Sequence, residues 1–134
     1  MSRLPNWECK LNAWVEKSTG RRFEWGQFDC ALAAASCVEA ITGDHPRPDL
    51  IGAYHTPLGA YRVIEANGGL GGICDALYTE INPKSVMRGD AVLGELDGKQ
   101  TLMIFTGNKY TFMAGGLMLV TDKDVNILKA WRVE

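Results

Sequence analysis

The chain has 134 residues, of which 46% are hydrophobic and 22% charged, and its formal net charge is −2. This length suits one domain over residues 1–134, and the composition excludes a disordered chain. The longest basic run is the pair Arg21–Arg22, so we expect no nucleic-acid partner. The longest apolar stretch, residues 31–41, is too short for membrane insertion. The first ten residues lack the apolar segment of a secretory signal, which predicts synthesis in a cytoplasm.

Four cysteines are present, and we interpret all of them as reduced thiols. They are Cys9, Cys30, Cys37 and Cys74. None forms a CxxC pair and no histidine lies at ligand spacing, so neither a metal site nor a cofactor is predicted. If Cys30 and Cys37 share a helix, about 10 Å of helix separates them, which is too far for a disulfide.

The first half of the chain has helical patterns. An amphipathic helix is expected over Pro5–Lys17, and a second, rich in small residues, over Ala31–Ile41. Asp29 is placed to cap the start of the second helix, and Gly43 to end it. After a loop over residues 44–56, a third helix starts at Pro57 and ends before residues 67–69, and a short fourth helix ends at Tyr78.

The second half of the chain has the pattern of short strands separated by glycine-containing turns. The expected strands are Ala91–Leu96, Thr101–Thr106, Tyr110–Ala114, Leu117–Thr121 and Ile127–Val133. Five strands in series predict one antiparallel sheet or partial barrel on which the helices pack, so the fold class is α+β. Asp90, which precedes the first strand, is interpreted as a turn residue.

Cys30 lies where the second helix is expected to begin. The helix dipole and the unpaired amides of a first turn favour a thiolate, which is the nucleophilic form of cysteine, and the amides could also hold an oxyanion. The alternative is that Cys30 is a small buried apolar residue. The glycines between residues 68 and 72 lack the lysine and the strand–helix context of a phosphate loop.

A cysteine nucleophile needs a base, and the chain has only two histidines, His45 and His55. His45 follows the far end of the Cys30 helix, roughly 17 Å from its start. His55, at the end of a loop, is therefore the candidate base, with a surface residue as the alternative. The β-rich half contains no histidine.

Several motifs resemble the NlpC/P60 cysteine peptidases, and more closely a group of small NlpC/P60-like proteins encoded among phage and prophage tail genes. The matching segments are Trp25–Cys30, Thr42–Asp44, Gly52–Tyr54, Gly68–Gly69, Arg88–Leu93, Leu102–Asn108, Gly116–Leu117 and Ala130–Val133. The resemblance implies a papain-like fold, with Cys30 at the nucleophile position and with Trp25 and Asp29 beside it as candidate binding residues. Thr101 occupies the position of the family's catalytic histidine, and it cannot act as a base.

These observations lead to three hypotheses. The first is a structural or assembly component of a phage or prophage tail, at the tail tip of the virion, whose partners are other tail proteins. The second is a cysteine peptidase that uses Cys30 to cleave peptidoglycan stem peptides during genome entry. The third is an unrelated bacterial binding domain.

Overall fold

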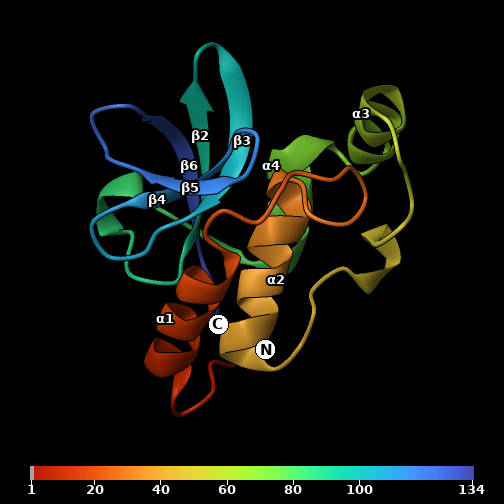
Figure 1. Cartoon of the computed structure of the whole chain (residues 1–134). Coiled ribbons are helices and arrows are strands. Elements are labelled where there is room, and N and C mark those ends of the chain that lie inside the picture. The colour runs from red at the N-terminus through yellow and green to blue at the C-terminus, as the bar shows by residue number, and fades with distance from the viewer. Residues whose placement is uncertain (1) are drawn as a thin grey trace.

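The structure, a computed structural model, describes residues 2–134 (Figure 1). Four α-helices precede the six strands, which confirms the α+β class. The helices are α1 (Trp7–Ser18), α2 (Cys30–Thr42), α3 (Pro57–Ala66) and α4 (Gly69–Leu77), and the strands are β1 (Thr79–Ile81), β2 (Ala91–Leu96), β3 (Lys99–Ile104), β4 (Tyr110–Met113), β5 (Leu117–Val120) and β6 (Asn126–Arg132). No helix within residues 2–134 combines the length and apolar character needed to cross a membrane.

The strands form two antiparallel sheets instead of the expected single five-stranded sheet. One has four strands in the order β1-β6-β2-β3, and the other is the β4–β5 hairpin. An isolated bridge between Phe105 and Tyr110 and a hydrogen bond from the Ile104 amide to the Thr111 hydroxyl link the hairpin to the β3 segment, but within residues 2–134 no continuous ladder connects the sheets. The sequence analysis missed β1, whose three residues pair with β6.

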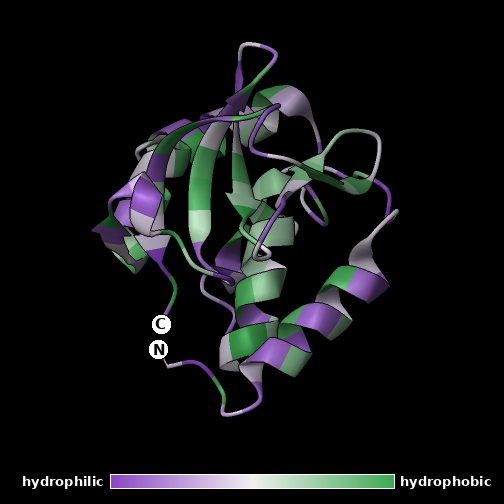
Figure 2. Cartoon of the chain, turned by 90° about the vertical axis from the view of Figure 1, so that its left-hand side faces the viewer, coloured by the Kyte–Doolittle hydropathy of each residue, from purple (hydrophilic) through white to green (hydrophobic). Residues whose placement is uncertain are grey.

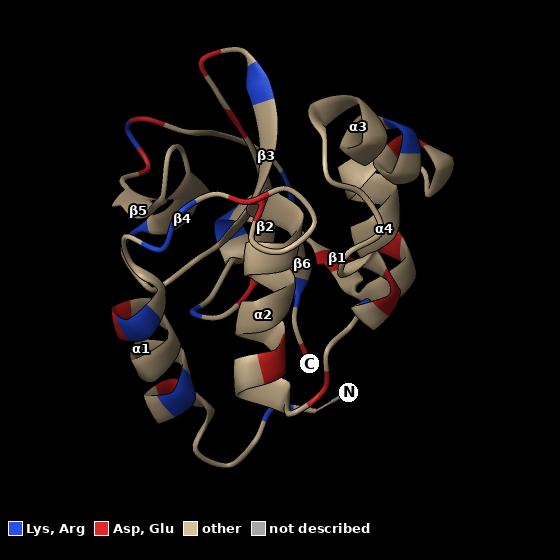
Figure 3. Cartoon of the chain, turned by 45° about the vertical axis from the view of Figure 1, so that its right-hand side comes forward, with Lys and Arg blue, Asp and Glu red and all other residues tan. Residues whose placement is uncertain are grey.

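Helix α2 is the centre of the helical layer, and it lies against α1 and the sheet (Figure 1). Ala33, Ala34 and Val38 on this helix are almost fully buried in the main core. Figure 3 shows α2 almost without charge, whereas α1 carries charges of both signs. Small apolar side chains therefore let β3 and α1 approach α2 closely, as its composition predicts.

The four-stranded sheet is apolar along its middle, which Figure 2 shows as green strands beside the helices. Trp131 on β6 is completely buried, and it lies in the same core as Leu93 and Leu102. The β2–β3 hairpin turns at Asp97–Gly98 and projects beyond the other strands (Figures 1 and 3). Its open side is the outer edge of β3.

Candidate functional site

Asp29 sets the start of α2 and thereby the position of Cys30. One carboxylate oxygen, Oδ1, accepts a hydrogen bond from the Leu32 amide at 3.0 Å, and Oδ2 accepts one from the Gly26 amide at 3.1 Å. The expected cap is therefore confirmed, and α2 begins at Cys30 itself. At the other end of the helix, Gly43 has the expected left-handed backbone, with φ of 84°.

A second segment holds the Asp29 carboxylate from the side. The Tyr54 hydroxyl donates a hydrogen bond to Oδ2 of Asp29 at 2.6 Å, and the Gly52 amide donates one to the Gly26 carbonyl at 2.8 Å. Gly26 has φ of 77°, and a Cβ there would lie 1.9 Å from the Tyr54 carbonyl oxygen. Two of the motifs noted in the sequence thus form one unit that presents Cys30.

Cys30 packs against β3 and is half-buried. Burial raises the pKa of its thiol, and the neighbouring Asp29 carboxylate raises it further. Hydrogen bonds with the Leu102 amide and the Thr101 hydroxyl act in the opposite direction but do not reverse the shift in pKa. Position 101, where the resemblance expects a histidine, lies beside Cys30. The pKa of the thiol is raised there, whereas the expected thiolate would need a lowered pKa.

Two adjoining hollows meet at Cys30, with volumes of ≈ 880 Å³ and ≈ 430 Å³. We call them together the Cys30 groove. Both are lined by Trp25, Cys30, Lys99 and Gln100. The larger hollow lies against α3 and α4, where the glycines of residues 68–72 form part of its wall, and the smaller one lies against the end of β4. Cys30 lines both hollows, so the thiol lies where they meet.

The other predicted site residues divide clearly. Trp25 lines the groove, whereas Asp29 is 2% exposed and lines neither hollow. His55 is exposed and is absent from the lining of both hollows. His45 lies beyond the far end of α2, where its Nδ1 accepts a hydrogen bond from the Arg47 amide at 3.1 Å. Within residues 2–134, no imidazole therefore faces Cys30.

Sequence analysis missed Lys99 and Gln100 as groove residues, because their place follows from how β3 packs against α2. It also missed Tyr54, although the Gly52–Tyr54 motif was a usable signal. Within the same described range, no cluster of three His, Cys, Asp or Glu side chains is arranged to hold a metal ion.

Asp90 is not the simple turn residue that the sequence analysis expected, because its side chain is completely buried. Oδ1 accepts hydrogen bonds from the Arg3 guanidinium at 2.8 Å and the Val133 amide at 3.1 Å. Oδ2 accepts them from Arg132 Nε and the Met87 amide, both at 2.9 Å. This carboxylate thus holds the two ends of the described chain together.

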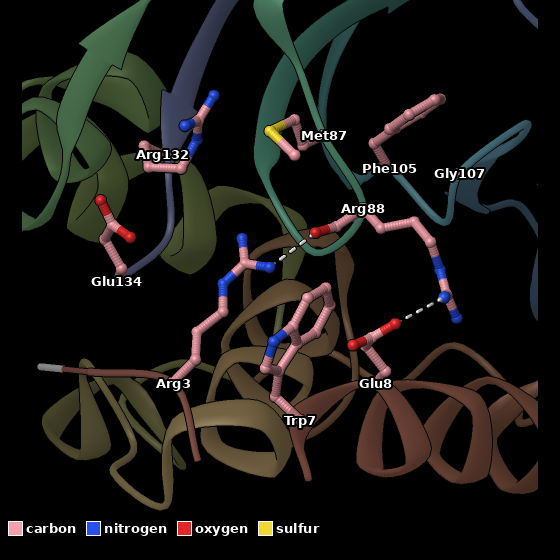
Figure 4. A pocket seen from close by; sticks show the side chains of 9 residues that line it. All are labelled: Arg3, Trp7, Glu8, Met87, Arg88, Phe105, Gly107, Arg132 and Glu134. Atoms are coloured by element: carbon pink, nitrogen blue, oxygen red, sulfur yellow. Dashed lines mark hydrogen bonds and ion pairs between the residues drawn. The ribbon is translucent and has the colours of Figure 1, made fainter. Parts of the chain in front are cut away.

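A separate hollow of ≈ 670 Å³ lies in front of this cluster (Figure 4). Its three arginines already have partners. Arg3 donates to the Arg88 carbonyl, and Arg88 is paired with Glu8 at 3.7 Å (Figure 4). Arg132 is paired with Asp90. The hollow shares no lining residue with the Cys30 groove. Its three arginines are thus already paired with groups of the protein, and we place the candidate site in the Cys30 groove.

A comparison with curated proteins finds no match for this chain. A family described as "Domain of unknown function (DUF6950)" matches residues 2–133, which is nearly the whole chain. The chain therefore belongs to the DUF6950 family.

Proposed function

We propose that this protein is a structural or assembly component of a phage or prophage tail, at the tail tip, built on a papain-like NlpC/P60 fold without hydrolytic activity. The arrangement around Cys30 supports the fold assignment. The cysteine begins a helix of small residues, and that helix packs on a strand that follows the Gly89–Asp90 strand entry. The order of the other matching motifs supports the tail assignment.

One observation supports the absence of hydrolysis. Cys30 has Thr101 and the Leu102 amide as hydrogen-bond partners, and its pKa is raised. Hydrolysis of an amide needs a thiolate to attack and an acid to protonate the leaving amine. Neither Thr101 nor the Leu102 amide can shuttle that proton, and loss of general acid–base catalysis costs a factor of about 100 to 10,000.

The test uses a phage or prophage that carries this gene. The gene is deleted and then supplied as wild type, as Cys30→Ser, or as Cys9→Ser, the last being an exposed control. We expect the protein in purified particles by mass spectrometry, a loss of complete tails in the deletion, and equal rescue by all three genes. Absence from particles would refute the tail assignment. Particles that assemble with Cys30→Ser but fail to infect would refute the non-hydrolytic role.

The alternative is a cysteine peptidase that cleaves peptidoglycan stem peptides, and the position of Cys30 favours it. The thiol lines both hollows of the groove at the first turn of a helix. The discriminating assay incubates reduced protein with murein and analyses the released fragments. We expect none. Release that Cys30→Ser abolishes would establish the peptidase.

The variant Thr101→His tests whether position 101 corresponds to the catalytic histidine of the NlpC/P60 peptidases, which both proposed functions assume. An imidazole at this position would favour the Cys30 thiolate, so alkylation of Cys30 should extend to lower pH than in the wild type. Thr101→Val, which also lacks a base, is the matched control. An unchanged pH profile in a folded Thr101→His variant would count against the papain-like assignment.

A further inference from the structure

The outer edge of β3 has free backbone groups inside the Cys30 groove. Among the strands of residues 2–134, this one pairs only with β2, and the two-residue turn Asp97–Gly98 makes Leu96 and Lys99 a hydrogen-bonded pair. In an antiparallel pair, every second residue directs its N–H and C=O away from the partner strand. The residues of β3 that face outward are Gln100, Leu102 and Ile104.

Two of these three residues already have partners for their amides. The Leu102 amide hydrogen-bonds to Cys30, and the Ile104 amide donates to Thr111 Oγ1 at 2.9 Å. Both bonds confirm the alternation worked out from the turn. For Gln100, neither the N–H nor the C=O has a partner within residues 2–134, and the residue is exposed. It lines both hollows of the groove.

Apolar side chains lie on both sides of this free edge. The larger hollow includes Ile64, Leu93 and Tyr61, the last of which is 64% exposed. The smaller hollow includes Phe23 and Phe112. A strand edge with one free donor and one free acceptor is complementary to the backbone of an extended peptide. Successive side chains of such a peptide point to opposite faces, so each hollow would receive every second side chain.

We propose that the Cys30 groove binds an extended segment of another protein by strand addition at Gln100, with apolar side chains of that segment in the two hollows. The inference rests on the proposed function, because a groove that does not hydrolyse can hold a peptide as a lasting contact. The free N–H and C=O belong to Gln100, which lies in a groove that Cys30 and the end of β4 also line. A single strand fits this space better than the edge of a second copy.

The probe is a pool of hexapeptides, acetylated and amidated, in which the two central positions are leucine or phenylalanine and the four outer positions are threonine, so that one apolar side chain can enter each hollow. Binding is followed by the amide NMR signals of the protein and by fluorescence anisotropy of a labelled pool. We expect a saturable shift of the Gln100 amide signal and slower exchange of its hydrogen. A peptide that cannot form the two backbone hydrogen bonds with Gln100 should bind more weakly by about tenfold or more. A pool that shifts no groove signal at millimolar concentration would overturn the proposal.

Two further pools carry N-methyl groups on alternate amides, one in each register. Strand addition predicts that one register loses binding by about tenfold and the other keeps it, because only every second peptide amide faces Gln100. Equal binding by both registers would show that side chains alone hold the peptide and would overturn strand addition. This comparison needs no variant of the protein.

The protein variants form a matched pair. Gln100→Pro removes the free N–H without breaking the ladder to β2, and proline is tolerated at such an edge, whereas Gln100→Ala keeps the backbone donor. We expect peptide binding to be lost with proline and kept with alanine, at equal melting temperature. If the wild type forms dimers and Gln100→Pro dissociates them, a second copy of the chain occupies the groove, and the peptide proposal is overturned. A protein found in particles that binds no peptide would refute this inference alone, whereas a peptide-binding protein absent from particles would refute only the tail assignment.

Discussion

Replacing Asp90 by asparagine should cause a large loss of stability, and its size follows from the contacts of the carboxylate. Asp90 is completely buried and accepts four hydrogen bonds, two of them from Arg3 and Arg132, which are 13% and 27% exposed. Asparagine keeps the shape, but its amide nitrogen must face two donors. Removing one partner of a buried ion pair costs about 3–5 kcal/mol. Domains are stable by about 5–15 kcal/mol, so this change removes a large share of the total.

The assay is thermal and urea unfolding of the wild type and Asp90→Asn. For a chain of this size, the expected loss corresponds to a fall in melting temperature of about 10–20 °C. The control is Glu8→Gln, because Glu8 is 65% exposed and makes only a 3.7 Å ion pair with Arg88. A fall of less than about 3 °C for Asp90→Asn would refute the reasoning that this carboxylate holds the chain ends.

Three further predictions concern the site and the core. Because burial raises the pKa of Cys30, its alkylation should be slower than that of the exposed Cys9 at neutral pH, by mass spectrometry; equal rates would contradict this. Gly26→Ala should lower the melting temperature and shift the Tyr54 ring signals in NMR, since a Cβ would lie 1.9 Å from the Tyr54 carbonyl oxygen; Gly98→Ala, in open space but likewise at positive φ, controls for backbone strain. Burial raises the pKa of Cys74 from its ordinary value of 9.0 to about 12. The unfolded chain therefore loses this proton first, so the contribution to stability is complete below about pH 9 and disappears as the pH rises through about 12. The urea midpoint should fall over this range, and Cys74→Ala should flatten the fall.

The helices were predictable because their signals are local. The Asp29 cap, the small residues of α2 and Gly43 lie within one short segment, and each has a direct physical role there. The same locality explains the β2–β3 hairpin, since Asp97–Gly98 is a typical two-residue turn and Asp97 has the positive φ, 53°, that such turns need.

The arrangement of the strands was less predictable because pairing depends on contacts far apart in the sequence. β1 has only three residues, and its partner β6 lies at the other end of the β-rich half. The turns around β4 and β5 are compatible with one sheet or with two, so they do not predict that this hairpin forms a separate sheet. Asp90 shows the same limit, because Arg3 is 87 residues away from it and Arg132 is 42 residues away.

The site was predicted in part. Cys30, Trp25 and position 101 lie together as the resemblance implies. His55 stays a prediction without structural support, because the loop before α3 directs Tyr54 inward and leaves His55 exposed. The pKa of Cys30 was expected to fall through the helix start, but a short motif does not reveal how deeply a sulfur is buried, and burial is the larger effect.

The order β1-β6-β2-β3 has a consequence for synthesis on the ribosome. The strand translated last, β6, lies between β1 and β2, so these two cannot join until residues 126–132 have left the exit tunnel. Until then the nascent chain exposes the inner edges of both strands and lacks Trp131, a fully buried core side chain. The complete sheet therefore forms only after β6 has been made, and a product truncated before residue 126 would have two open edges and a tendency to aggregate.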